Sequence, residues 1–315
     1  ELLAGGVGTV GDGFFHDAGV VALRETGQRG VFFREFFGVS APDDGDYLAA
    51  CERRIDEDLA RVPGGLVGYG LAPHAPYTCP GAVLAGLAAR AERDGLRLSI
   101  HVAESPEEDD FFRRRRGPMM ARFDRGDRHD LGRSPVAALA ARGALGPRTL
   151  LVHAVHVDED DLDLIASSGA TVVHCPGSNH HLGVGVAPIV ALRARGIPLA
   201  IATDSAASRG KLDLFEEMRL AVFAQRAAAR NATALDATAA LEAATLGGAR
   251  ALGLEDRIGS LEVGKDADLA AVRLDRLRHR PCVDPVFALV FSAQTDDVLG
   301  VWVAGRRLHA REREA

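Results

Sequence analysis

The stretch TLLVHAVHVDEDDLDLIASSGATVVH, residues 149–174, reads as a strand, a helix and a second strand in succession. Its two short β-rich apolar runs, 149–152 and 170–173, flank a segment whose apolar residues recur at helical spacing and which ends at Gly169. Two strands separated by such a helix are the repeating unit of a parallel sheet. This stretch therefore predicts a parallel (β/α) fold.

The same alternation continues on both sides of this stretch. We count seven apolar runs: 7–10, 30–37, 66–71, 96–102, 149–152, 170–173 and 197–202. A closed (β/α)8 barrel needs eight strands, so seven indicate either an open sheet or a barrel whose first strand lies outside this sequence. Because the sequence begins at Glu1 rather than at methionine, we favour the second interpretation, a TIM-type barrel.

The pattern changes after residue 202. Two longer helical patterns follow, over residues 211–229 and 232–253. Beyond them the chain has Gly-punctuated runs of Val, Leu and Trp without helical spacing, which predict a small β-sandwich-like domain. We therefore expect a barrel over residues 1–253 and a C-terminal β-domain segment over residues 254–315.

The composition argues against several classes of binding partner and of fold. The chain has 315 residues, with 37 Lys and Arg against 44 Asp and Glu, a net charge of −7 that argues against nucleic acid and anionic membranes. Four cysteines without a C-x-x-C pair argue against a disulfide scaffold or a zinc ribbon. No apolar run approaches the ~18 residues of a membrane helix, and the opening lacks the features of a signal peptide. We expect a cytoplasmic protein.

Ionisable residues gather where the predicted strands end. They are His74, His101, Glu104, His153, His174 and Asp204, spread over five consecutive run ends. In a parallel (β/α) fold the carboxyl ends of the strands surround one mouth, where the active site lies. The sequence therefore predicts that these side chains converge.

The residue types at this mouth suit a divalent metal that activates water. Imidazole nitrogen and carboxylate oxygen bind borderline ions such as Zn2+, so His101 and Asp204 are candidate ligands. Glu104 lies three residues after His101, where it could move protons without binding the metal. Asp204 could also accept a proton from the water, and His153 could orient it. The alternative role for Glu104 is a carboxylate at the start of the helix in ESPEE.

Other polar residues have weaker roles in this interpretation. His174 could approach substrate or support the metal. Arg34, in FFREFF near the end of run 30–37, is a candidate substrate contact. The run Arg113–Arg116 is either a solvated loop or a cover for the mouth that binds a substrate carboxylate.

Five motifs together resemble a known family. They are LAPHAPYTCP, SIHVAESPEE, LLVHAVHVDEDDL, GATVVHCPGSNHHLGVGVAPI and IATDSAASRGKLDLFEEMRLA. In this order they resemble the amidohydrolase superfamily, in particular its branch of aromatic deaminases and chlorohydrolases. Within that branch the chain is similar to deaminases of 5-methylthioadenosine, S-adenosylhomocysteine and aminodeoxyfutalosine.

The resemblance implies roles for individual residues. It implies that His101 and Asp204 bind the metal and that Glu104 and His153 take part in proton transfer and water activation. It also implies that His74 contacts substrate, with Ser208 in TDSAAS as a further candidate. The family's first strand carries a His-x-His metal pair that this sequence lacks, and we favour truncation over true loss as the reason.

These observations lead to one expected function. We expect a metal-dependent hydrolase of a small molecule that deaminates an aminopurine nucleoside-like substrate, with Zn2+ or Fe2+ as the ion. The alternatives are a chlorohydrolase or amide hydrolase with the same machinery, or a barrel without catalysis that lacks the first-strand ligands. A homodimer is the general expectation for such an enzyme.

Overall fold

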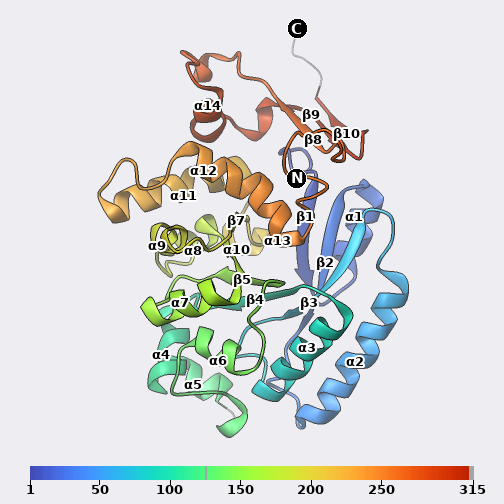
Figure 1. Cartoon of the computed structure of the whole chain (residues 1–315), viewed down its shortest axis with the longest axis vertical. Helices are drawn as coiled ribbons and strands as arrows, with labels where there is room; N and C mark the ends of the chain where they lie inside the picture. The colour runs from blue at the N-terminus through green and yellow to red at the C-terminus, as the bar shows by residue number, and fades with distance from the viewer. Residues whose placement is uncertain (125, 312–315) are drawn as a thin grey trace.

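The computed structural model describes residues 1–124 and 126–311, and a seven-stranded parallel sheet dominates it (Figure 1). The strands follow one another in sequence order across the sheet: β1 Thr9–Phe14, β2 Arg29–Phe36, β3 Val67–Pro73, β4 Leu98–Val102, β5 Thr149–His153, β6 Thr171–His174 and β7 Leu199–Ile201. Each lies within or overlaps one of the seven predicted runs. The prediction of a parallel (β/α) barrel fold with seven strands is confirmed.

Helices connect these strands. They are α1 Ala18–Thr26, α2 Asp44–Arg61, α3 Gly81–Asp94, α4 Pro106–Arg114, α5 Pro118–Phe123, α6 Pro135–Ala141, α7 Glu159–Ser168, α8 Pro176–His181, α9 Ile189–Ala194, α10 Ala206–Arg209, α11 Leu214–Ala229, α12 Ala237–Glu242 and α13 Gly248–Leu252. Residues with clear capping roles mark both ends of α7. Asp158 and Asp161 form a reciprocal capping box at its start, and Gly169 ends it with a φ of 72°.

The strands present two different faces. On β2, Phe32 and Phe36 belong to the large core between the sheet and its helices, whereas Val31 and Phe33 belong to a smaller core that lines the inside of the curled sheet. Gly70 makes room for this inner layer, because a Cβ at that position would lie 2.6 Å from the Phe33 ring. The alternation of side chains therefore decides which residues of a strand can reach the mouth.

The C-terminal part contains a three-stranded antiparallel sheet of β8 Leu269–Val272, β9 Val298–Val303 and β10 Arg306–Ala310, with β9 in the centre. It lies beside the N-terminus (Figure 1). Arg29, at the start of β2, is 2% exposed and binds the carboxylates of Asp266 and Asp268 at 2.6 and 2.9 Å. This buried ion pair links the large sheet to the segment that enters β8.

The expectation that the tail has no helices is wrong, because α14 spans Pro285–Phe291 and packs against α11 and α12 (Figure 1). Asp284 caps its first turn, and Pro285 occupies the first helical position. A seven-residue apolar run fits a buried strand as well as a helix, so periodicity alone did not separate the two.

None of the helices in the described ranges is long and apolar enough to cross a bilayer.

Arg34 lies on the outer face of β2, like Phe32, and not at the mouth. Its side chain is 2% exposed, and its Nε donates to Oδ2 of the fully buried Asp58 at 2.6 Å. The same guanidinium also pairs with Asp17, and Tyr69 donates its hydroxyl to Asp58 at 3.1 Å. These contacts do not support a role for Arg34 in binding substrate, because its donors are already used inside the helix layer.

We predict that Arg34→Met destabilises the fold. The change leaves the partly exposed Arg54 and Arg61 as the charged partners of Asp58. Removing one member of a buried ion pair lowers the free energy of unfolding by about 3 kcal/mol. Urea titration measures this loss. Arg53→Met, the same change at an exposed position of α2, is the matched control. Equal stability of the two variants would contradict the assigned role.

Candidate active site

Ionisable side chains from four strand ends lie close together. They are His74 after β3, His101 on β4 with Glu104 just beyond it, His153 at the end of β5, and Asp204 after β7. The imidazole centroids of His74 and His101 are 4.9 Å apart, and those of His101 and His153 are 5.5 Å apart. His153 Nε2 lies 3.5 Å from Glu104 Oε1. The structure brings these residues together, whereas His174, which was predicted to converge with them, lines a separate cavity.

The electrostatics of this cluster keep its imidazoles neutral. Burial lowers the pKa of His101 and of His153, and the nearby Asp204 carboxylate opposes the shift in both. Burial also lowers the pKa of His74 to about 3 and raises that of Glu104. Neutral imidazoles are the form that binds a metal ion.

The backbone at these strand ends is bent into the left-handed region. Ala103, His153, Ala154 and Asp204 have φ values of 51°, 75°, 46° and 58°. Non-glycine residues adopt this conformation at a cost of about 1–3 kcal/mol each, and they concentrate at functional sites. The strain is therefore localised at the mouth, next to the ionisable cluster.

Hydrogen bonds select the tautomer of each imidazole. Nδ1 of His101 donates to the backbone oxygen of His74 at 2.9 Å, since a carbonyl can only accept. Nδ1 of His74 lies 2.9 Å from the Thr78 hydroxyl, which itself donates to the backbone oxygen of Ala75. In both rings the proton is therefore on Nδ1, and Nε2 is left as an acceptor or metal ligand.

The segment after β6 supports two members of the cluster. Ser178 donates its hydroxyl to Asp204 Oδ2 at 2.6 Å, and Asn179 Oδ1 accepts a hydrogen bond from His153 Nδ1 at 2.8 Å. Both side chains are fully buried. Neither residue was predicted, although polar residues in CPGSN directly after a strand end were an available signal.

The side chain of Glu108 holds the backbone of Glu104 in place. Its Oε2 accepts a hydrogen bond from the Glu104 N–H at 2.8 Å, and its side chain is 1% exposed. Burial raises the pKa of Glu108 to about 8. The motif ESPEE indicates a helix start, which Ser105 does cap, and it gave no separate signal for the role of Glu108.

Glu35 is the second acidic residue that the sequence did not reveal. It lies on the inner face of β2, next to Arg34 on the outer face. Within the described part of the chain, Glu35, His74 and His101 form a group whose possible ligand atoms all lie within 4.8 Å of one another. Asp204 is not a member of that group. Burial raises the pKa of Glu35 to about 7.

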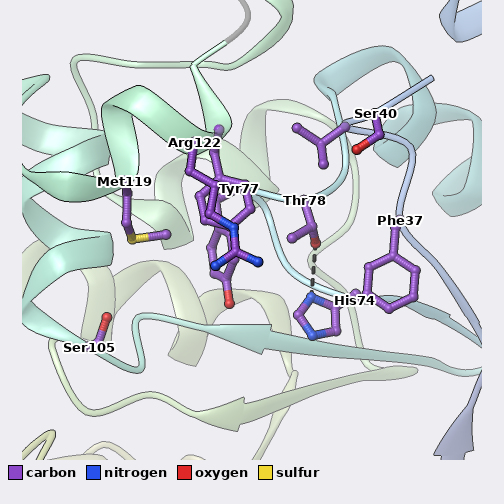
Figure 2. A pocket seen from close by; sticks show the side chains of 10 residues that line it. Phe37, Ser40, His74, Tyr77, Thr78, Ser105, Met119 and Arg122 are labelled. Carbon is purple, nitrogen blue, oxygen red and sulfur yellow. Dashed lines mark hydrogen bonds between the residues drawn. The ribbon is translucent and has the colours of Figure 1, made fainter. Parts of the chain in front are cut away.

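A cavity of about 720 Å3 lies beside the cluster, since His74 lines it and its ring lies close to that of His101. Figure 2 shows the side chains that line it. His74 and Ser105 form the side of the cavity nearest the cluster. The remaining lining residues are Phe37, Val39, Ser40, Tyr77, Thr78, Met119, Arg122 and Phe123. Its volume is that of a typical small-molecule site.

Two predicted substrate contacts lie elsewhere. The Ser208 hydroxyl is 3.0 Å from that of Ser205, and its backbone N–H completes the cap of α10. His174 is 2% exposed, lines a separate cavity of about 400 Å3 with Leu199 and Ile189, and has no hydrogen-bond partner for its ring nitrogens among the described residues.

The arginine run does not cover the mouth. Arg113 binds Asp109, Asp158 and Asp161, while Arg114 and Arg116 bind Asp110. Arg115 donates to the backbone oxygen of Leu131. The solvated, ion-paired interpretation of this run agrees with these contacts better than carboxylate binding does.

Comparison with known proteins identifies the family. The model of the amidohydrolase family matches residues 1–308, and the chain belongs to this family. It is 37% identical over 308 residues to 5-methylthioadenosine/S-adenosylhomocysteine deaminase of Desulforudis audaxviator, covering 97% of this chain and 67% of the relative. It is 38% identical over 243 residues to the protein of the same name from Teredinibacter turnerae, covering 77% and 52%.

Solved structures give the same result. An adenosine deaminase from Xanthomonas campestris with bound zinc superposes with a TM-score of 0.84 at 35% identity, covering 98% of this chain and 67% of that one. Atrazine chlorohydrolase from Arthrobacter aurescens, complexed with zinc, gives 0.82 at 27%, covering 97% and 69%. The family resemblance and the prediction of an amidohydrolase-type enzyme that uses a divalent metal are confirmed. The chain spans about two thirds of most of these proteins.

Proposed function

We propose that this protein is a zinc-dependent deaminase of an aminopurine nucleoside-like substrate. The observation that carries the proposal is the meeting of His101, Glu104, His153 and Asp204 at one mouth, beside a cavity of small-molecule size. The names of the relatives, which are deaminases of purine nucleosides, support the choice of substrate class.

The donor set fits a divalent metal. His101 offers Nε2 because its Nδ1 is bonded to a backbone oxygen, and Asp204 offers a carboxylate that Ser178 orients. We propose these two residues as ligands, with zinc favoured because it is the ion in the related structures. When bound, such an ion lowers the pKa of a water molecule from about 15.7 towards about 7.

The protein's own residues would then move the protons. Water adds to the ring carbon that bears the amino group, and Glu104 transfers one proton from this water to the adjacent ring nitrogen. His153, held by Asn179, orients the water, and Asp204 accepts the second proton and returns it to the amine. The C–N bond breaks, and ammonia and the oxo product leave. His74, which lines the cavity, is the proposed substrate contact.

We predict that the zinc-loaded protein releases ammonia from purine nucleosides that carry an exocyclic amine. Adenosine, 5′-methylthioadenosine and S-adenosylhomocysteine are the probes, and a coupled ammonia assay with the change in ultraviolet absorbance is the measurement. Chloride release from a chlorotriazine is the competing outcome, because the similar chlorohydrolase structure has the same fold. Chloride release without ammonia would replace deamination with that function.

We predict that Glu104→Gln retains the metal and loses at least about 100-fold in turnover, because glutamine cannot carry a proton. Glu107→Gln, the same change at the neighbouring exposed position of α4, is the control and should be unaffected. Metal content is measured by elemental analysis and turnover by ammonia release. A near-normal rate in the Glu104 variant would remove this residue from the mechanism.

We predict that Ser178→Ala weakens zinc binding by about 10- to 100-fold, because the hydroxyl holds the Asp204 carboxylate in place. Competition with a fluorescent chelator measures the affinity directly. Ser167→Ala on the exposed side of α7 is the matched control. If both variants bind zinc like the parent protein, Asp204 is not a ligand that depends on Ser178.

A further inference from the structure

The cavity that His174 lines is separate from the one beside the ionisable cluster. Its volume is about 400 Å3, and Leu199 and Ile201 of β7 line it together with Ile189 of α9. Leu199 and Ile201 pack against the large core between the sheet and its helices, whereas Ala200 belongs to the inner core. The cavity therefore lies on the outer face of the sheet, and it shares no lining residue with the cavity beside the cluster.

The helices that close this cavity present small residues to it. They are Ala221 of α11, Ala239 and Ala240 of α12, and Ala243 and Gly247, which bound a π-helical turn. A Cβ at Gly247 would lie 2.2 Å from the backbone oxygen of Leu199, so this turn lies directly against β7. Single π-helical turns are frequent at functional sites. The small residues leave room for a ligand between the sheet and the helices.

His174 is the buried polar side chain of this cavity. It is 2% exposed, and neither of its ring nitrogens has a hydrogen-bond partner among residues 1–124 and 126–311. Leaving a buried donor or acceptor unpaired costs about 1–3 kcal/mol, and most such groups in proteins are paired. Burial lowers the pKa of His174 to about 3, so the ring is neutral and offers one N–H donor and one acceptor nitrogen.

The charged residues of the lining belong to the exposed surface. Arg193, Glu242 and Arg250 are exposed, and Glu242 pairs with Arg250 at 3.2 Å. Apart from these three and His174, the described lining consists of Ala, Gly, Ile, Leu and Pro, without an aromatic side chain. A charged group inside the cavity would lose its hydration without gaining a buried partner of opposite charge. The chemistry of the lining therefore favours a neutral, aliphatic molecule.

We propose that this cavity is a second ligand site, which binds a neutral aliphatic alcohol whose hydroxyl pairs with His174. A hydroxyl both donates and accepts, so it can pair with either nitrogen of the neutral imidazole. The aliphatic lining covers the rest of the molecule, and the volume lies within the usual range of small-molecule sites. This inference does not depend on the proposed deaminase function.

The test compares cyclohexylmethanol with ethylcyclohexane, in which a methyl group replaces the hydroxyl. Headspace gas chromatography over solutions of the protein measures both affinities. We expect the ratio of the two affinities to fall at least about 10-fold in His174→Leu, the effect of one hydrogen bond. His174→Gln keeps a donor and an acceptor, so it should retain part of the preference. An unchanged ratio in His174→Leu would overturn the proposal, as would tighter binding of benzyl alcohol than of cyclohexylmethanol by the parent protein.

Further variants show where the alcohol binds. Ala239→Leu extends a side chain into the cavity and should abolish binding of the alcohol, whereas Ala227→Leu, the same change at an exposed position of α11, should not. His74→Leu alters the other cavity and should keep the ratio of the parent protein. A ratio that falls only in His74→Leu, or an equal loss of binding in both alanine variants, would overturn the proposal.

A readout on the parent protein needs no variant to fold. Cyclohexylmethanol should shift the ring 15N resonances of His174 in a titration followed by NMR spectroscopy, because it forms a hydrogen bond to the ring. Ethylcyclohexane should shift them less. Resonances of His174 that do not move at saturating cyclohexylmethanol would overturn the proposal.

Discussion

The backbone oxygen of His74 accepts two hydrogen bonds from the next strand, and the candidate site depends on this contact. Both the backbone N–H and the imidazole Nδ1 of His101 donate to it at 2.9 Å. The first bond joins the ends of β3 and β4, and the second fixes the orientation and the tautomer of the His101 ring. One carbonyl oxygen therefore both pairs the two parallel strands and orients the imidazole of the proposed metal ligand.

The fold was predictable because its signals are local. Each parallel strand is a short apolar run bounded by turn residues, and the intervening helices carry their own caps, as Asp158 and Gly169 do for α7. α14 was missed because its apolar run is short and because its buried face is set by α11 and α12, two helices distant in sequence that a local pattern does not include. Tertiary packing decided that segment.

The candidate site was predictable only in part, for a geometric reason. Strand-end positions such as His101 and His153 follow from the parallel topology alone. The choice between Arg34 and Glu35 depends on which of two adjacent side chains faces inwards, and a one-residue shift exchanges the faces. Arg34 was chosen for its charge, whereas Asp58, 24 residues away, holds that guanidinium on the outside. Ser178 and Asn179 likewise gain their roles only from residues on other strands.

The ionisable cluster and the cavity wall come from different kinds of chain segment, the first from strand ends and the second partly from a connection between strands. Strand ends and the buried Ser178 and Asn179 hold the ionisable cluster, where small displacements would disturb proton transfer. Arg122 instead lies on a short helix in the connection between β4 and β5, where the chain can change without disturbing the sheet register. A family with one barrel chemistry could therefore acquire different substrate preferences by altering such connections.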